Sequence, residues 1–592
     1  MPIPPRRLCA NLCAASLATL RHVREDPASF LLLLGRRFPA GVGVATANVV
    51  ERLGWAGELY ACWLRGEREA AQSLLASPPR RLNRRAARFA TDLAVAMNRV
   101  DLAPLPESQR STRVRARSLW NQGDVTGALD TLASARGADA KYRTLLEDER
   151  QLLQPGFALS AATTPAVPHA EDNEVRVLHL LTNSLPHTRS GYTMRSHRIL
   201  KAQQAAGMSV IAVTRIGYPV LVGRLFARDV DVVDGIPYRR VIPALLPGSA
   251  RERLELMVRE LDAVVREFRP TVIHTTTNYT NALVAQAVAR RHGLPWVYEV
   301  RGMLEKTWVA SQRTDSARAL AAASERFSLM RAREAELAAA ADHVVTLSGI
   351  MKDDLAARGV ATERITVVPN SIDASLLEHD SSSADARAQL GLPRDGYWVG
   401  AVSSLVDYEG HDVLIEAVAS LRSEGHDVRL LLAGDGVARP ELVRLASERL
   451  GDTAVLPGRV SGEDAIRHVL ALDAVVVPRK DLDVTRSVTP LKPIEAMALR
   501  RPVVMSDLPP LREVCGDANA PRAILVAPDS ATELASGILR VRDAGAQERR
   551  RRIDEALAYA RLLTWQQAAS KYASIYRNIL ASARTCGTIE NY

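Results

Sequence analysis

Short apolar runs alternate with longer helical segments along most of the chain, from Val175 onward. The strand candidates of the first part are VRVLHLL, MSVIAVT, TVIH, PWVYEV, HVVTL and RITVVP. After a polar break at roughly 374–394, the pattern begins again with YWVGAVS, VRLLLAG, LDAVVVP, PVVM and AILVAP. This alternation predicts parallel sheets covered by helices on both faces. We therefore expect two Rossmann-like, doubly wound α/β domains, over residues 175–378 and 395–559, facing each other across a cleft.

A different pattern fills residues 1–153, which are rich in Ala, Leu and Arg and have few β-branched runs. It predicts an all-α region. The segments WAGELYACWLRGEREAAQSLL and RSLWNQGDVTGALDTLASA each indicate a helix, a glycine-containing turn and an Ala-rich helix, which resembles tetratricopeptide helix pairs. Residues 154–174 contain Pro, Ala and Thr without periodicity and are interpreted as a linker. At the other end, residues 560–592 have helical apolar spacing from Trp565 onward.

Charge narrows the range of partners. The 592 residues include 77 Lys and Arg against 67 Asp and Glu, a net charge of +10, which favours an anionic partner. A phosphate-bearing substrate or an anionic membrane surface fits better than nucleic acid, because aromatic residues make up only 5% of the chain. The basic cluster Arg80, Arg81, Arg84, Arg85 and Arg88 is either a solvated helix face or a surface for phospholipid or a protein partner.

Cysteine usage and hydropathy indicate in which cellular compartment the protein is expected. The five cysteines are scattered and form no zinc pattern, which is typical of a reducing cytoplasm. No apolar run approaches the roughly 20 residues that a membrane-spanning helix needs. The stretch LCANLCAASLATL loosely resembles a signal peptide, but Asn11 and the following charges favour an ordinary helix. We expect a cytoplasmic protein, with peripheral contact at the inner face of the membrane as the alternative to a wholly soluble one.

Candidate phosphate ligands follow the strand that ends at Val477. Arg479 and Lys480 come directly after it, and Lys492 lies in the segment TPLKPIEAMA, which is expected to open a helix. Free amides at a helix start and the helix dipole both favour an anion. We expect this segment, with Thr489 and Leu491 at its beginning, to hold a phosphate group; the alternative is ordinary surface charge in a loop.

Other strand ends carry weaker signals. Gly191 follows the first strand and would let the backbone approach a ligand closely. Gly434 and Gly436 close the segment LLAGDG, where a tight strand-to-helix turn is the simpler explanation. In YEVRG, Glu299 and Arg301 flank Val300, so both can point from the strand end into a cleft, or they can form a satisfied ion pair.

The carboxylate of Glu495 is unusual, because it sits among apolar residues just after Pro493. In isolation it could simply favour the first turn of a helix through the dipole. Beside a phosphate site, however, a carboxylate is suited to accept hydrogen bonds from the hydroxyls of a ribose.

Taken in order, SGYT, ARRHGLPWVYEVRG, ADHVVTLSGIMKDDL, ITVVPNSID, LVDYEGHDVLIEAV, LLLAGDG and TPLKPIEAMALRRPVV resemble the retaining GT-B glycosyltransferases of family 4. The resemblance covers roughly residues 175–577. LVDYEG, YEVRG and TPLKPIEAMA are further similar to the branch that assembles capsular and extracellular polysaccharide. The resemblance to family 4 implies that the second α/β domain binds a nucleotide-sugar donor and that the first mainly binds the acceptor. It also implies a final helix that crosses back to the first domain.

The resemblance also implies residue roles. Glu495 matches the second of two acidic residues in the family motif and would bind ribose. The first acidic position falls on Ser487, so sugar contact passes to Ser487, Thr489 or backbone amides. The usual Arg and Lys after the first strand of the second domain align with Ser404 and Glu409, so both positive charges are missing there.

These observations predict a retaining glycosyltransferase that uses a nucleotide-diphosphate sugar and a lipid-linked or glycan acceptor. Glu299, Arg301, Ser487 and Glu495 are the candidate catalytic residues. We expect no cofactor and no metal, because side chains and amides can stabilise the diphosphate leaving group. A nucleotide-sugar epimerase on the same fold and a non-catalytic GT-B scaffold, whose N-terminal helices recruit partners, are the alternatives.

Overall fold

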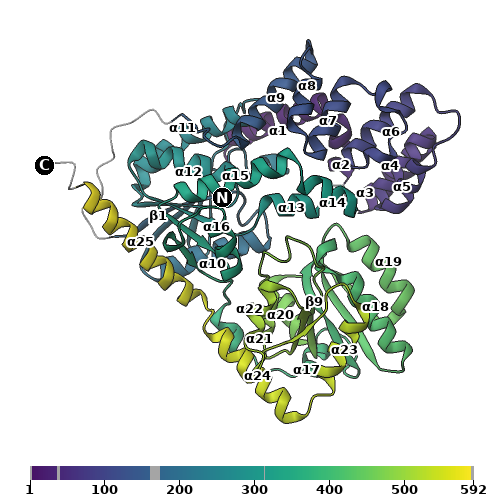
Figure 1. The fold of residues 1–592 in the computed structure, drawn as a ribbon, viewed down its shortest axis with the longest axis vertical. Coiled ribbons are helices and arrows are strands. Elements are labelled where there is room, and N and C mark those ends of the chain that lie inside the picture. The colour runs from purple at the N-terminus through teal and green to yellow at the C-terminus, as the bar shows by residue number, and fades with distance from the viewer. Residues whose placement is uncertain (1–2, 36–39, 161–173, 313, 588–592) are drawn as a thin grey trace.

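The computed structural model describes residues 3–35, 40–160, 174–312 and 314–587. A helical region is followed by two α/β domains, and the last helices run along both (Figure 1). The prediction of two parallel-sheet domains preceded by helices is confirmed. Most of the predicted linker, residues 161–173, lies outside the described residues.

The helical region contains two glycine-linked helix pairs, α4 with α5 and α7 with α8, as the sequence indicates. In each pair the first helix ends at a glycine in the left-handed conformation, Gly66 (φ 83°) and Gly123 (φ 94°), which only glycine adopts readily. The helices of the region are α1 (Pro5–Glu25), α2 (Pro27–Gly35), α3 (Ala40–Val50), α4 (Trp55–Arg65), α5 (Arg68–Ala76), α6 (Arg84–Ala96), α7 (Thr112–Gln122), α8 (Val125–Thr131) and α9 (Ala138–Leu153).

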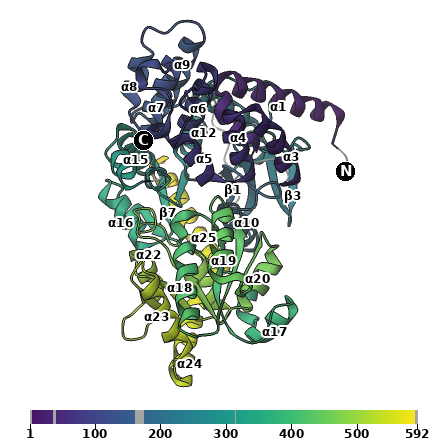
Figure 2. The same cartoon turned by 90° about the vertical axis from the view of Figure 1, so that its right-hand side faces the viewer.

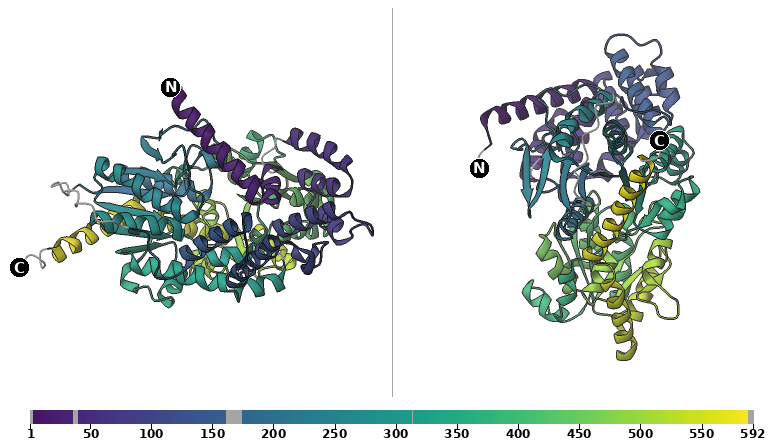
Figure 3. Two further views of the ribbon diagram at one scale, coloured as in Figure 1. Left: turned by 90° about the horizontal axis from the view of Figure 1, so that it is seen from above. Right: turned by 90° about the vertical axis from the view of Figure 1, so that its left-hand side faces the viewer.

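The helical region is anchored on the first α/β domain. Helix α1 lies across it, seen clearly from above in Figure 3. The buried Asn11 amide of α1 donates hydrogen bonds to the carbonyl oxygens of Leu225 (2.9 Å) and Ala227 (2.8 Å). Farther along, the backbone amide of Arg326 donates to the Gly123 carbonyl (3.0 Å). The α4–α6 end of the region extends away from β1 (Figure 1) and lies above the second α/β domain (Figure 2).

The first α/β domain is built on an eight-stranded sheet of order β3-β4-β2-β1-β5-β6-β7-β8. All neighbours are parallel except the β3–β4 hairpin, which the sequence analysis missed. Its turn residues Asp234 (φ 49°) and Gly235 (φ 80°) are typical of a tight hairpin. The strands are β1 (Arg176–Leu181), β2 (Ser209–Thr214), β3 (Val230–Val233), β4 (Ile236–Arg240), β5 (Val272–Thr276), β6 (Trp296–Val300), β7 (His343–Thr346) and β8 (Ile365–Val367).

Helices cover both faces of this sheet, as parallel strands require. Strands β5 and β6 are buried at every position, and they pack with α11, α12 and α15 into one apolar core. The helices of the domain are α10 (Gly191–Ala205), α11 (Ala250–Phe268), α12 (Tyr279–His292), α13 (Leu304–Ala310), α14 (Asp315–Ala322), α15 (Glu325–Ala340) and α16 (Gly349–Ala357).

The second α/β domain has a six-stranded, all-parallel sheet of order β11-β10-β9-β12-β13-β14. Its strands are β9 (Tyr397–Ser404), β10 (Val428–Asp435), β11 (Ala454–Gly458), β12 (Ala474–Val477), β13 (Val503–Ser506) and β14 (Ile524–Val526). Its helices are α17 (Ser383–Gln389), α18 (His411–Ser423), α19 (Arg439–Leu450), α20 (Gly462–Leu470), α21 (Lys492–Ala498), α22 (Pro509–Cys515), α23 (Ala531–Arg542) and α24 (Ala546–Arg561).

The chain crosses between the two domains twice. It enters the second domain after Ile372, whose backbone pairs with the returning chain at Leu563 and Trp565. Helix α25 (Trp565–Gly587) then lies against the first domain (Figure 1), where Tyr572 and Tyr576 are fully buried. Among the described residues, none of the helices is long and apolar enough to cross a bilayer.

Candidate functional site

The end of β6 carries a buried charge network rather than groups that face a cleft. Glu299 is completely buried and accepts hydrogen bonds from Arg195 (2.9 Å), Arg301 (2.8 Å) and the Tyr572 hydroxyl (3.0 Å). Burial acts to raise the pKa of Glu299, but the two guanidinium groups outweigh it and hold that pKa well below its usual range. The expectation that Glu299 points into the cleft is therefore wrong; a satisfied ion pair is present instead.

Arg301 is likewise enclosed, at 3% exposure, and the same correction applies to it. Its guanidinium donates to the Ser196 hydroxyl (2.7 Å) and the Tyr192 carbonyl (3.2 Å), both on α10. Arg301 and Glu299 thus fix the start of α10 relative to β6. Both side chains therefore serve to position α10.

In the second domain, a carboxylate lies between two cations at the carboxyl end of the sheet. Glu409 is 6% exposed and accepts from Arg479 (3.1 Å), which follows β12, and from Lys492 (2.5 Å), which begins α21. Burial acts to raise the pKa of Glu409, but Arg479 and Lys492 hold it far below its usual value. Burial also lowers the pKa of Lys492, and the negative charge of Glu409 opposes this lowering. One net positive charge remains in this buried triad.

The structure separates Lys480 from that triad. Its ammonium pairs with Asp407 (2.9 Å) and Asp412 (2.8 Å), near the beginning of α18. Two carboxylates therefore compensate the charge of Lys480. Of the three cations predicted to hold a phosphate, only Arg479 and Lys492 share an acidic partner, Glu409.

Glu495 lies at the boundary between the domains. Its carboxylate faces the guanidinium of Arg198 on α10, at 3.6 Å, and its side chain is 31% exposed. Burial raises the pKa of Glu495, and Arg198 opposes that rise. Because the ion pair is long and the carboxylate keeps an accessible edge, Glu495 can still accept further hydrogen bonds.

Two more hydrogen bonds form at the same boundary. Ser487 is 4% exposed and accepts a hydrogen bond from the ammonium of Lys306 on α13 (2.7 Å), which also pairs with Asp354. Asn370, just before the crossover, donates to the Thr489 carbonyl (2.9 Å). The Thr489 hydroxyl is buried without a hydrogen-bond partner among the described residues, although buried hydroxyls are usually paired. A ligand acceptor or donor at this point would satisfy it.

The three predicted glycines fall into two groups. A Cβ on Gly434 would lie 1.7 Å from the Ser403 carbonyl oxygen, and one on Gly436 would lie 2.1 Å from the Leu405 oxygen. Close packing of β9 against β10 explains both glycines without a ligand. At Gly191, the first residue of α10, a Cβ would meet no atom within 4 Å, so open space borders the backbone there.

Sequence reasoning missed Lys306 and Tyr192. Tyr192 is 59% exposed at the start of α10, and a Cβ on Gly302 would lie 3.0 Å from its hydroxyl. The segment SGYT, which places Tyr192 after Gly191, was the available signal. Lys306 lies 181 residues from its partner Ser487, so no local pattern could connect them.

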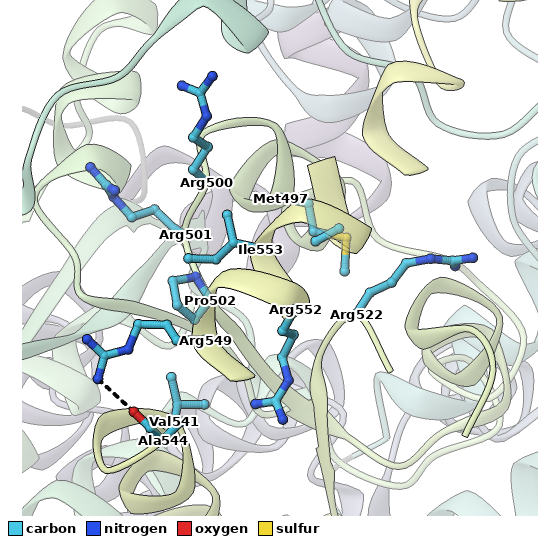
Figure 4. Close-up of a pocket in the computed structure, with 11 residues that line it drawn as sticks. Met497, Arg500, Arg501, Pro502, Arg522, Val541, Ala544, Arg549, Arg552 and Ile553 are labelled. Atoms are coloured by element: carbon cyan, nitrogen blue, oxygen red, sulfur yellow. Dashed lines mark hydrogen bonds between the residues drawn. The ribbon is translucent and has the colours of Figure 1, made fainter. Parts of the chain in front are cut away.

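A separate cavity shares none of these residues. It lies between α21, β13, α23 and α24 and is lined by Arg500, Arg501, Arg522, Arg549 and Arg552. Their guanidinium groups fan outward from its centre, and Arg549 donates to the Ala544 carbonyl (3.3 Å) (Figure 4). The cavity therefore presents aliphatic stems rather than converging charge, and it adds nothing to the candidate site.

Two parallel-sheet domains, a polar boundary at the carboxyl end of the second sheet and a final helix returning to the first domain define the GT-B fold. Comparison with known families agrees. Residues 190–371 match the family model described as "Glycosyl transferase 4-like domain", and residues 396–543 match "Glycosyl transferases group 1". These two matches identify residues 190–371 and 396–543 as glycosyltransferase domains.

Curated relatives are glycosyltransferases as well. A "D-inositol 3-phosphate glycosyltransferase" of Acidothermus cellulolyticus is 27% identical over 266 residues, covering 43% of this chain and 57% of that protein. An "Alpha-D-kanosaminyltransferase" of Streptomyces kanamyceticus is 28% identical, covering 34% of this chain and 50% of that protein. The chain spans about half the length of these relatives. A "GDP-mannose-dependent alpha-(1-6)-phosphatidylinositol dimannoside mannosyltransferase" of Mycobacterium tuberculosis is 26% identical, covering 60% and 83%.

Solved structures support the fold. Sucrose-phosphate synthase from Thermosynechococcus elongatus superposes with a TM-score of 0.55 at 21% identity, covering 69% of this chain and all of that one. Anabaena HepE, in complex with UDP and glucose, superposes with a TM-score of 0.51 at 18% identity, covering 68% of this chain and all of that one. At these identities the likeness establishes the GT-B fold alone.

Proposed function

We propose that this protein transfers a sugar, with retention of anomeric configuration, from a nucleotide-diphosphate sugar to a lipid-linked or polysaccharide acceptor. The observation that carries the proposal is the arrangement at the start of α21. There Arg479 and Lys492 share the partner Glu409, and Glu495, with an accessible carboxylate, lies three residues after Lys492 on α21. The Thr489 hydroxyl just before α21 has no hydrogen-bond partner among the described residues. Cations beside a carboxylate suit a diphosphate joined to a ribose.

Charge development explains why these groups would accelerate transfer. The bond between the anomeric carbon and the diphosphate oxygen breaks, and its electron pair stays on the phosphate. Arg479 and Lys492 would stabilise that charge in place of a metal, because fixed cations aimed at developing charge lower the barrier. The acceptor oxygen bonds to the anomeric carbon on the same face, and its proton passes to the departing phosphate. Glu495 would hold the ribose hydroxyls.

The names of the relatives suggest acceptor chemistry. Several are D-inositol 3-phosphate glycosyltransferases, and the mycobacterial relative is named for a phosphatidylinositol dimannoside. We infer a polar or lipid-linked acceptor bound against the first domain, near α10 and Tyr192. Work in capsular or extracellular polysaccharide assembly is the proposed setting.

A non-catalytic role is the second candidate, and one observation favours it. Glu409 occupies the position where family members carry a cation, and it consumes the charge of Arg479 or Lys492. A protein that binds nucleotide sugars but never turns them over would retain the fold with this weakened electropositive site.

Nucleotide-sugar binding and turnover together test both candidates. The full-length protein is incubated with UDP, GDP and ADP sugars, and release of nucleoside diphosphate and thermal stabilisation are followed. Glu495→Gln should weaken binding about 10- to 100-fold, because a hydrogen bond to a charged group contributes roughly 1.5–3 kcal/mol. Glu513→Gln is the matched control, since Glu513 also bridges the domains, accepting from the Ile350 amide (2.9 Å).

The possible outcomes distinguish the transferase from the non-catalytic candidate. Turnover with one sugar, lost in the Glu495 variant and kept in the Glu513 variant, supports the transferase. Stabilisation without turnover, in the presence of candidate acceptors, supports the scaffold. A folded protein that neither binds nor turns over any nucleotide sugar contradicts both.

A further inference from the structure

The helical region carries a cluster of unpaired arginines outside the glycosyltransferase domains. The cluster consists of five arginines between the end of α5 and the second turn of α6, and all five are exposed. They are Arg80, Arg81, Arg84, Arg85 and Arg88. None forms an ion pair or a side-chain hydrogen bond with another described residue, although most other arginines of the chain do. Arg88 acts electrostatically on Asp92, one turn further along α6, and the charge of the other four is available to an external anion.

Local stability does not explain this placement. Arg84 and Arg85 occupy the first turn of α6, which contains no acidic residue, and Asn83 caps the helix by accepting from the Ala86 amide (2.8 Å). Cations at the amino end of a helix oppose its dipole, at about 0.3–1 kcal/mol each when exposed. The arginines thus cost the helix stability, and a binding partner outside the chain would account for them.

Half-buried apolar side chains border the cluster, and two strongly exposed ones precede it in the chain. Ala56 on α4 and Phe89 on α6 line one open depression together with Arg84 and Arg85. Just before α4, on the adjoining α3 and the short helix η1 (Glu51–Leu53), Val49 is 66% exposed and Leu53 is 75% exposed. Helices α3 to α6 gather at one end of the helical region (Figure 1). We call Val49, Leu53, Phe89 and the five arginines the basic–apolar surface.

We propose that the basic–apolar surface docks on a bilayer of anionic phospholipid. The arginines would bind lipid phosphates, and Val49 and Leu53 would enter the interfacial region. The depression is open rather than enclosed, and Arg84 and Arg85 line it together with Asn83, two alanines and Phe89, so that its rim is positively charged, as an anionic lipid surface requires. A protein partner would typically meet a packed apolar core with aromatic anchors. Both family models begin after this region, so the surface is an addition to the glycosyltransferase fold.

Sedimentation of the full-length protein with vesicles tests the proposal without any need for activity. Vesicles of phosphatidylcholine alone are compared with vesicles that also contain phosphatidylglycerol. Only the second kind should pellet the protein at low salt, and added salt should release it. A basic residue near an anionic surface contributes about 1 kcal/mol, or roughly fivefold in partitioning. Changing Arg80, Arg84, Arg85 and Arg88 to Gln should therefore weaken binding on the order of several-hundred-fold.

A matched variant separates this surface from net charge. Four exposed arginines of the second α/β domain are changed to Gln, with the same loss of four charges: Arg394, Arg449, Arg459 and Arg467. This variant should bind anionic vesicles like the unaltered protein. Far-ultraviolet circular dichroism and thermal unfolding confirm that both variants are folded. Leu53→Ser, at a side chain that is 75% exposed and so has little packing to lose, should weaken binding about tenfold.

Three results would overturn the proposal. One is failure of the unaltered protein to prefer phosphatidylglycerol vesicles. Another is equal loss of binding in the two fourfold variants, which would reduce the effect to overall charge. The last is retention on immobilised polyglutamate, dependent on the α6 arginines, without vesicle binding, which would assign the surface to an acidic protein.

Discussion

The buried triad of Glu409, Arg479 and Lys492 makes a quantitative prediction about Glu409→Gln. Glutamine keeps the shape of the side chain and removes its charge, leaving two cations close together at a site that is 6% exposed. Removing one partner of a buried ion pair typically costs about 3–5 kcal/mol. For a domain of roughly 150–250 residues, 1 kcal/mol shifts Tm by about 2–4 °C, so the second α/β domain should melt about 6–20 °C lower.

The pH dependence of this loss has a definite sign. Arg479 and Lys492 outweigh the effect of burial and depress the pKa of Glu409, so its stabilisation is fully present above the ordinary carboxyl pKa of about 4.3. That stabilisation is lost as the pH falls toward the depressed folded-state pKa. The difference in Tm between the unaltered protein and Glu409→Gln should therefore be constant near neutrality and shrink in acid.

Differential scanning calorimetry of both proteins across this pH range is the assay. Glu416→Gln is the matched control, because Glu416 pairs with Arg449 (2.5 Å) on the surface of the same domain, at 37% and 52% side-chain exposure. An exposed pair contributes about 0–1 kcal/mol, so this variant should melt within about 4 °C of the unaltered protein. If Glu409→Gln and Glu416→Gln melted alike at neutral pH, the triad would not be the buried, mutually dependent unit argued here.

Three further predictions follow from single contacts. Thr489→Val removes a buried hydroxyl that lacks a protein partner, so the free protein should be at least as stable, while nucleoside diphosphate should bind about 2- to 10-fold more weakly by titration calorimetry. Gly434→Ala forces a Cβ into a neighbouring carbonyl and should cost roughly 2–5 kcal/mol in denaturant unfolding, whereas Gly191→Ala should leave stability within about 0.5 kcal/mol. Glu299→Gln should lower Tm relative to the unaltered protein at neutral pH, and this difference should vanish in acid. Burial raises the pKa of Glu299, but Arg301 and Arg195 outweigh it and depress that pKa, so the stabilisation is lost as the carboxylate is protonated.

The fold could be predicted largely from local pattern, because buried parallel strands are continuous apolar runs separated by helical segments. The pattern failed where strands are neither fully apolar nor buried. Strand β3 alternates exposed and half-buried positions at the sheet edge, and β11 is only partly buried, so neither stood out. The hairpin between β3 and β4 did carry a usable signal in its Asp-Gly turn.

The site was harder to predict, because alternation along a strand shows to which face a side chain points but not whether other elements bury it there. Glu299 and Arg301 do share one side of the β6 end, as expected, but α10 and α25 cover that side and turn both into structural groups. Arg479 was placed correctly after its strand. Its partner Glu409 lies 70 residues away, so only the folded chain reveals that this carboxylate and Lys492 belong to the same cluster.

That cluster also gives a physical account of the chain's departure from the family pattern. A carboxylate at position 409 would be costly beside a diphosphate unless nearby cations exceeded it in charge, and Arg479 and Lys492 do so by one unit. Glu409 in turn favours the charged form of Lys492, because burial lowers the pKa of that ammonium and the neighbouring carboxylate opposes the lowering. When a diphosphate binds, its own charge can replace Glu409 as the partner of either cation. The acid would then serve to hold two buried cations in place, charged and aligned, until the donor arrives.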